Sequence, residues 1–473
     1  IRGAGVGLLP TTETVDKDLI DAYFWLKTPG ESDGCSQTLP DGSECPRYDA
    51  DCGSQDSLGT QAGEPPAPEA GQWFDYQIKQ LAANAKLTKA QNVLLTLSET
   101  ISLHSASHSN KTTALQMSLM RATSSNPFEG RAFYVNPSYA EELGVSIASA
   151  EGQVKTTLEL MVDVASAYWL DTKAKIRGTS SKTMEGILKD AADKSPPELV
   201  TFIVYDLPNR DCHAKASNGE ICCTYLPDGR CDYAAAGDCA EGLEEYKSTY
   251  IDEIASVLKE YNDKVPIVLV IEPDSLPNLS TNRGDPRCGN SATEAAYKTG
   301  IKYAVEHLSE MAPSAAMYLD SGHGGWLGWK NNMQDFVSTI QGLGVAQHLR
   351  GFATNVAGYQ GLGMMCPTYD YCLNHAHPED PCCADPCGLT DEWDPSHNEH
   401  NYALHLHKAM SEGIPGFVPH IIIDTGRNGV EDARQSCKNW CNIRGAGVGL
   451  IPTTATADPN IIDAYFWLKT PGE

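Results

Sequence analysis

The chain has 473 residues, of which 41% are hydrophobic and 21% charged, and its formal net charge is −27 at pH 7. This length is sufficient for one large globular core. The negative charge argues against binding to nucleic acid or to an anionic membrane surface, because both would be repelled. No stretch of the sequence approaches the roughly 18 consecutive apolar residues of a membrane span. We therefore expect neither nucleic acid nor membrane as a partner.

The beginning and the end of the chain are near copies of one another. Residues 1–31 and 443–473 differ at only six positions. The distance between the copies, 443 − 1 = 442 residues, is too long for a solenoid repeat and is similar to the size of one catalytic domain. We interpret the chain as slightly more than one unit of a tandem array of similar domains, with the cut falling inside a domain.

Residues 91–125 are rich in Ser and Thr and carry a modest helical pattern. We interpret them as the connector between neighbouring units. An extra helix packed on the domain is an alternative that the pattern leaves open.

Seven apolar, β-branched runs predict buried strands. Amphipathic stretches at 243–263 and 295–311 lie between some of these runs and predict helices. Strands that alternate with helices form βαβ units and a parallel sheet. The predicted fold class is therefore α/β, with a distorted, incomplete β/α barrel around a central parallel sheet. The runs are residues 165–171, 198–208, 265–275, 315–323, 350–359 and 419–429, together with the segment IDAYFWLKTPGE that occurs in both copies.

Carboxylates follow the predicted strands at their C-terminal ends, which is the face where a β/α barrel carries its chemistry. A single Asp after a strand is more often a helix N-cap than a catalyst. Because six strand ends show the same feature, we favour an active site over a set of caps. The residues are Asp171, Asp206, Asp211, Glu272, Asp274, Asp320, Asp424, Glu31 and Asp33.

The 16 cysteines lie mostly in polar, Gly-rich and Pro-rich stretches. Cysteines in long loops usually form disulfides in an oxidising compartment, so we expect a secreted, extracellular protein. A sequon at Asn110 agrees with secretion. Zinc is the alternative for the segment CLNHAHPEDPCCADPC, residues 372–387, but its cysteine spacing fits a structural zinc site only loosely. We expect no metal and no cofactor.

Six separate blocks of the sequence stand out, at residues 25–34, 204–220, 270–288, 318–329, 349–359 and 439–442. Together these blocks closely resemble the family 6 glycoside hydrolases, the secreted cellobiohydrolases and endoglucanases that act on β-1,4-glucan.

The order of these blocks departs from the family pattern. By this resemblance, residues 1–90 correspond to the C-terminal portion of a catalytic domain, and residues 126–442 to the N-terminal and central portion. Residues 443–473 would begin the next C-terminal portion. Neighbouring identical domains, in a tandem array or a head-to-tail assembly, are therefore expected partners.

The resemblance implies that Asp274 is the general acid and that Asp211 raises its pKa and supports the attacking water. Asp33 matches a third carboxylate, and the second copy of the duplicate ends two positions short of it. The family inverts the anomeric configuration, which requires about 6.5–9.5 Å between the two carboxyl groups so that water fits.

The resemblance also implies a set of residues that bind cellulose or cello-oligosaccharides, with Trp side chains as flat platforms for sugar rings. Lys469 and Glu473 are the counterparts of Lys27 and Glu31 in the second copy. The other implied residues are Trp169, Asp171, Tyr205, Ser217, Asn278, His323, Trp326, Asn355 and Trp440.

Two disulfides are implied by the same resemblance. One joins Cys212 to Cys288, and the other joins Cys52 to Cys441. The second bond would close a permuted domain if it formed within one chain, or link neighbouring units if it formed between two chains.

Long, cysteine-rich loops after Glu31 and after Glu220 favour a covered tunnel and therefore an exo-acting enzyme that releases cellobiose. An endo-β-1,4-glucanase is the first alternative. A non-catalytic, carbohydrate-binding scaffold repeat is the second.

Overall fold

The computed structural model describes residues 126–472, apart from 213–216, 236, 283, 393, 432, 435–438 and 440–442. The expectations for residues 1–125, with Lys27, Glu31, Asp33 and Cys52, lie outside the described residues. The expectations for Trp440, Cys441 and Glu473 lie outside them as well. In the part of the chain that is described, no helix has the length and apolar character needed to cross a membrane.

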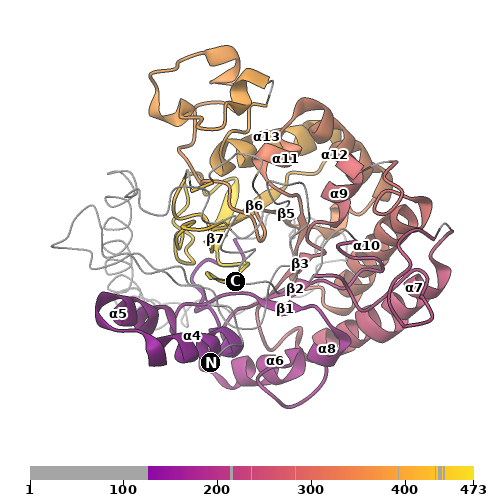
Figure 1. Cartoon of the computed structure of the whole chain (residues 1–473). Helices are drawn as coiled ribbons and strands as arrows, with labels where there is room; N and C mark the ends of the chain where they lie inside the picture. The colour runs from indigo at the N-terminus through magenta and orange to yellow at the C-terminus, as the bar shows by residue number, and fades with distance from the viewer. Residues whose placement is uncertain are drawn as a thin grey trace, which may run out of the picture.

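A parallel sheet of seven strands forms the centre of the molecule, with the strands in the order in which they occur along the chain (Figure 1). All seven predicted runs contain a strand. The strands are β1 (Tyr168–Leu170), β2 (Val200–Val204), β3 (Ile267–Ile271), β4 (Ala316–Asp320), β5 (Gly351–Thr354), β6 (His420–Asp424) and β7 (Ile462–Phe466).

The sheet curls into an incomplete barrel, as predicted. Strands β1 and β7 are its two edges, and a backbone hydrogen bond of 2.9 Å from Ala167 to Trp467 joins the segments beside them. The indole of Trp169 donates to the carbonyl of Leu468 at 2.8 Å across the same opening. The opening is therefore bridged by a few contacts and not by a strand ladder.

Strand β7 belongs to the second copy of the duplicated segment. Its residues pair with β6 in parallel, from Ile421 with Ile462 to Asp424 with Phe466. The second copy thus occupies the last position of the sheet in the described chain. The carboxylate of Asp463 accepts hydrogen bonds from Tyr318 at 2.5 Å and from Arg350 at 2.9 Å, which ties this strand to the segments of β4 and β5.

Helices surround the outer face of the sheet (Figure 1). Asn290 and Asn398 cap two of them by accepting backbone N–H groups of the first turn. Gly344 ends α12 with a left-handed φ of 68°, which suits glycine. The helices are α4 (Pro137–Ser149), α5 (Gly152–Met161), α6 (Met184–Asp193), α7 (Ala240–Glu245), α8 (Asp252–Tyr261), α9 (Ser275–Asn282), α10 (Ser291–Met311), α11 (Gly324–Leu327), α12 (Lys330–Leu343) and α13 (Glu399–Gly413). A π-helical turn, Tyr246–Ile251, connects α7 to α8.

Apolar side chains are buried on both faces of the sheet. Phe202 and Val204 pack outward against the helices, while Ile203 and Tyr205 pack in the smaller interior cluster. Burial on both faces explains why the strands read as continuous apolar runs and not as alternating ones.

The segment between β5 and α13 projects from the barrel as a lobe (Figure 1). It contains three short 3₁₀ turns: Leu373–His375, Pro381–Cys383 and Leu389–Glu392. Two disulfides, Cys366–Cys382 and Cys372–Cys383, hold it together.

Candidate active site

Several predicted carboxylates are fully buried and accept backbone N–H groups from neighbouring strand ends. Glu272, after β3, accepts the N–H of Asp206, after β2, at 3.2 Å. Asp320, at the end of β4, accepts the N–H of Asp274 at 3.0 Å. Asp424, at the end of β6, accepts the N–H of Lys469 at 2.9 Å. These carboxylates hold adjacent strand ends together, a role that the sequence did not reveal.

Burial raises the pKa of each of these buried carboxyl groups, because a charge is poorly solvated in the interior. The pKa of Asp206 rises to about 9, with the nearby Arg210 opposing the shift. The pKa of Glu272 and that of Asp320 rise to about 7, and the pKa of Asp424 rises to about 6.

Asp211 and Asp274, the two principal predicted catalytic residues, differ from this buried set. Both residues are half-buried. Both have a left-handed backbone, with φ of 48° and 61°, a feature that Glu272 of the buried set shares with a φ of 47°. Such conformations are uncommon for residues other than glycine and cluster at functional sites. Burial raises the pKa of Asp274 well above its usual range, and the charges of Asp211 and Asp320 raise it further. The two predicted residues therefore share one electrostatic environment.

Tyr205 positions Asp211. It follows β2, and its hydroxyl donates a hydrogen bond to the Asp211 carboxylate. Burial raises the pKa of Tyr205 well above its usual value, so that the hydroxyl keeps its proton. The Tyr205 ring meets Trp169 edge-on at a centroid distance of 5.1 Å, and Lys469 Nζ lies 5.0 Å from the centre of the Trp169 ring. The structure thus brings four predicted residues to one wall: Trp169, Tyr205, Asp211 and Lys469.

Arg210 supports this wall and was not among the predicted residues. Its guanidinium lies 4.0 Å from the centre of the Tyr205 ring. It also donates to the backbone carbonyls of Asp171 at 3.0 Å and Ser217 at 2.9 Å. The Asp171 carboxylate pairs with Lys175 at 2.7 Å. Arg210 therefore connects two predicted sugar-binding residues through their main chains.

A second group of predicted residues lies on the segment after β4 and on α9. The rings of His323 and Trp326 have centroids 6.0 Å apart. The Trp326 indole donates to Thr281 on α9 at 3.1 Å. Asn278, also on α9, accepts a hydrogen bond from Asn282 at 3.3 Å.

Asn355 is almost completely buried, and its amide is engaged by the main chain. Its Nδ2 donates to the carbonyl of Asp424 at 3.1 Å and to that of Gln360 at 3.2 Å, while its Oδ1 accepts the N–H of Gln360 at 3.1 Å. In the structure, Asn355 holds the loop after β5 against the end of β6. Its contact with sugar stays a prediction.

Disulfides hold the loop that carries Asp211. Cys212 and Cys288 form the bond that the family resemblance implies, with a Cα–Cα distance of 5.7 Å. Two further disulfides staple the following loop, namely Cys222–Cys231 and Cys223–Cys239.

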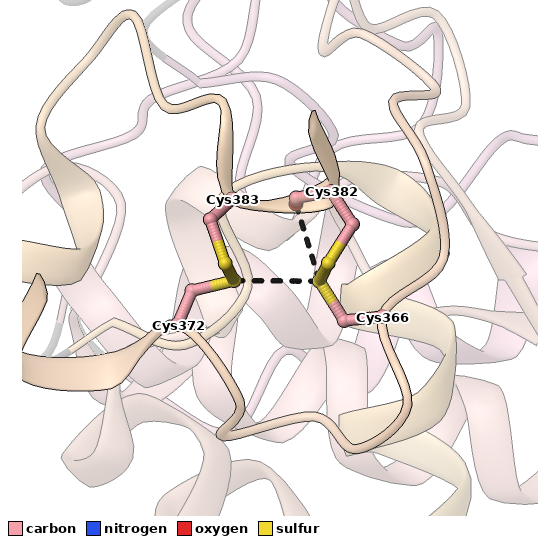
Figure 2. Close-up of side chains that lie close together, drawn as sticks. All are labelled: Cys366, Cys372, Cys382 and Cys383. Carbon is pink, nitrogen blue, oxygen red and sulfur yellow. Dashed lines mark hydrogen bonds between the residues drawn. A yellow bond between two sulfur atoms is a disulfide. The ribbon is translucent and has the colours of Figure 1, made fainter. Parts of the chain in front are cut away.

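Four cysteines of the projecting lobe, Cys366, Cys372, Cys382 and Cys383, form one compact sulfur cluster (Figure 2). Their sulfur atoms all lie within 4.8 Å of one another, and those of Cys366 and Cys372 are 3.3 Å apart. The sulfurs are paired as disulfides, in agreement with the favoured interpretation of the segment 372–387 and not with the zinc alternative.

Comparisons with known proteins agree with this geometry. The profile of the family described as "Glycosyl hydrolases family 6" matches residues 1–85 and 128–473. The chain is 36% identical over 353 residues to "Exoglucanase 3" of Agaricus bisporus, a match that covers 74% of this chain and 69% of the relative. It is 37% identical over 359 residues to "1,4-beta-D-glucan cellobiohydrolase C" of Emericella nidulans, with the same coverage.

Solved structures of cellobiohydrolases are also similar to this chain. The catalytic core of the cellobiohydrolase Cel6A from Chaetomium thermophilum is 32% identical, with a TM-score of 0.57 over 73% of this chain and 86% of that one. The CcCel6A catalytic domain, solved with p-nitrophenyl β-D-cellotrioside, is 34% identical, with a TM-score of 0.58 over 73% of this chain and 84% of that one.

Proposed function

Because the chain belongs to the glycosyl hydrolases of family 6, we propose that it hydrolyses β-1,4-glucan with inversion at the anomeric carbon. The observation that carries this proposal is the pair formed by Asp211 and Asp274. Asp274 has a raised pKa and Asp211 contributes to it. A hydrolase of this kind needs one protonated carboxyl group beside one that remains charged.

In the proposed reaction, Asp274 donates its proton to the glycosidic oxygen while that bond breaks. A water molecule attacks the anomeric carbon from the opposite side and loses a proton, through further water, toward Asp211. The Tyr205 hydrogen bond keeps the Asp211 carboxylate in place during this transfer. Trp169 and Trp326 supply flat surfaces for sugar rings.

The decisive experiment measures reducing-sugar release from amorphous cellulose by the parent protein and by an Asp274→Ala variant. We expect release by the parent and a loss of at least about 100-fold in the variant, which is typical for removal of a general acid. ¹H NMR of the first product should show the α-anomer. Saturable binding of cello-oligosaccharides without release by the parent would favour the non-catalytic scaffold instead.

We infer an exo-acting cellobiohydrolase, because the loop that follows Asp211 is long and carries two disulfides. A stapled loop costs less entropy to hold over a substrate than a free loop. The names of the two relatives above, exoglucanase and cellobiohydrolase, support the same inference. Cellobiose as the main early product from cellohexaose would support it, and a rapid fall in the viscosity of carboxymethylcellulose would indicate an endoglucanase.

We also infer that the protein works outside the cell. The five disulfides between described cysteines support this, since such bonds persist in oxidising compartments. Treatment of the purified protein with a thiol-blocking reagent under denaturing conditions should reveal no reactive cysteine.

The permuted, tandem organisation is a further proposal. It is supported by the duplicated segment and by the match of the family profile to two separate ranges, 1–85 and 128–473. A disulfide map by mass spectrometry tests it. A Cys52–Cys441 bond within one chain would indicate a closed, permuted domain, whereas the same bond between chains would indicate linked units. If Cys52 and Cys441 are bonded to one another neither within one chain nor between chains, the result would contradict the proposal.

A further inference from the structure

The side chain of Gln360 lies between three polar groups that come from different parts of the chain. Its Oε1 accepts the backbone N–H of Gly325 at 2.6 Å and lies 2.9 Å from His323 Nδ1. Its Nε2 donates to the carbonyl of Ser396 at 3.0 Å. Gln360 itself is 2% exposed, so water does not compete for these bonds.

These neighbours fix the orientation of the Gln360 amide. A backbone N–H can only donate and a carbonyl can only accept. Turning the amide over would set the NH₂ group against the N–H of Gly325 and the oxygen against the carbonyl of Ser396. Both contacts would be repulsive, so Oε1 must face Gly325 and His323.

This orientation in turn fixes the position of the proton on His323. An amide oxygen cannot donate, and therefore Nδ1 of His323 must carry the hydrogen of the 2.9 Å contact. Burial lowers the pKa of His323 to about 4. The ring is thus neutral at higher pH, and its second nitrogen, Nε2, carries a lone pair. The structure records no hydrogen bond of Nε2 to any of the described residues.

Two carboxylates hold the loop around His323 by accepting hydrogen bonds from its backbone N–H groups. The N–H of Gly322 is accepted by Asp320 at 3.2 Å, and the N–H of Gly324 by Glu399 at 3.0 Å. A Cβ on Gly324 would lie 2.7 Å from Gln360 Nε2, so a larger residue would displace the amide. These contacts fix the backbone on both sides of His323.

We propose that Gln360 is a positioning residue that holds His323 as the Nδ1–H tautomer, so that Nε2 accepts a hydrogen bond from a hydroxyl of the glucan. The tautomer of His323 does not depend on the proposed function. Only the identity of the hydroxyl, as one of a glucan, rests on the proposed glucan hydrolysis. It assigns a specificity: the position facing His323 must carry a donor, so a sugar whose hydroxyl there is replaced by hydrogen or fluorine binds less tightly.

The direct test is ¹⁵N NMR of the full chain with labelled histidine, with the His323 signals assigned by their loss in a His323→Gln variant. We expect the shifts of a protonated Nδ1 and an unprotonated Nε2 between pH 5 and pH 8. An unprotonated Nδ1, or a doubly protonated ring at neutral pH, would overturn the proposal whether or not the protein is an enzyme.

A kinetic test uses Gln360→Leu, which removes the acceptor, together with Gln360→Glu, which keeps an acceptor for His323 but replaces the Nε2 donor that faces the Ser396 carbonyl. We expect KM for cellohexaose to rise about 10-fold in Gln360→Leu, which corresponds to one hydrogen bond to a neutral group, with a smaller change in kcat. Gln341→Glu on the exposed face of α12 is the matched control, and its KM should equal that of the parent. An unchanged KM in a folded Gln360→Leu variant would contradict the proposal.

The Gln360→Glu variant adds a pH signature that a purely structural role would not give. A carboxylate beside the Nδ1–H group raises the pKa of His323. Below that pKa, Nε2 becomes a donor, so KM should rise at low pH and return toward the parent value at high pH. Asp320, Glu399 and Arg434 also act on this loop, and they are common to parent and variant. A pH profile of KM identical to that of the parent would contradict the proposed role.

Discussion

The hydroxyl of Tyr205 donates a hydrogen bond to the carboxylate of Asp211, so the end of β2 holds the charged partner of Asp274 in place. The Tyr205 ring is itself held between Trp169 and the guanidinium of Arg210. The strand, the aromatic wall and the carboxylate are therefore one connected unit. A change in Tyr205 should act on the chemistry and leave the fold intact.

Tyr205→Phe removes only this hydroxyl and keeps the ring contacts. We expect kcat on cello-oligosaccharides to fall about 10-fold, in line with the loss of one charge-assisted hydrogen bond, and KM to change little. Tyr303→Phe is the matched control, because it also removes a Tyr–Asp hydrogen bond, 2.6 Å to Asp252, but between the outer helices α10 and α8. An equal loss of kcat in both variants would point to a general effect on stability.

Asp320→Asn tests the electrostatic coupling at the site. The Asp320 charge raises the pKa of Asp274, and an Asn side chain can still accept the N–H of Asp274. Removing the charge should lower the pKa of the general acid, so the alkaline limb of the kcat/KM profile should move to lower pH. Asp163→Asn, at an exposed turn, should leave the limb unchanged. A limb that stays in place in Asp320→Asn would disprove the coupling.

The Cys212–Cys288 disulfide spans 76 residues, whereas Cys222–Cys231 spans 9. From the entropy of the unfolded chain, replacing the first pair by Ser should lower the free energy of unfolding by about 4.5 kcal/mol, and replacing the second by about 2.6 kcal/mol. Because Cys212 follows Asp211 directly, the first double variant should also lose more activity. Urea unfolding and initial rates measure both effects. Equal losses in the two variants would contradict this ranking.

The sequence was sufficient to predict the strands and the half-barrel. Parallel strands that are covered on both faces have continuous apolar sequences such as IVLVI (Ile267–Ile271). Such runs are typical of buried parallel strands. The pairing of Asp211 with Asp274 was implied by the family resemblance, and in the structure the charge of Asp211 raises the pKa of Asp274. The pattern could not separate catalytic from structural carboxylates, because Glu272 and Asp274 are both acids after one strand. Only their burial and hydrogen-bond partners distinguish them.

Arg210 and Gln360 were missed for a related reason. Both are polar residues in loops, and each acts by joining backbone groups from segments that are distant in the sequence. Such a role has no periodicity or spacing of its own. An Arg directly before the predicted Asp211 was the one available signal, since a buried carboxylate such as Asp206 needs a cation nearby.

Glu399 provides the last prediction, which concerns stability. It is fully buried at the start of α13 and its pKa is raised by burial from 4.5 to about 8. Its contribution to stability is therefore fully present below about pH 4.5 and is lost as the pH rises toward 8, because only the unfolded chain ionises readily in that range. Glu399→Gln keeps an acceptor for the N–H of Gly324 and cannot ionise. The variant should match the parent in Tm at pH 4.5 and exceed it at pH 8, as measured by calorimetry. Glu412→Gln, on the same helix with a side chain that is 71% exposed, should follow the parent at both values. A Glu399→Gln variant that loses Tm with pH as steeply as the parent would show that this buried carboxyl is not a source of alkaline instability.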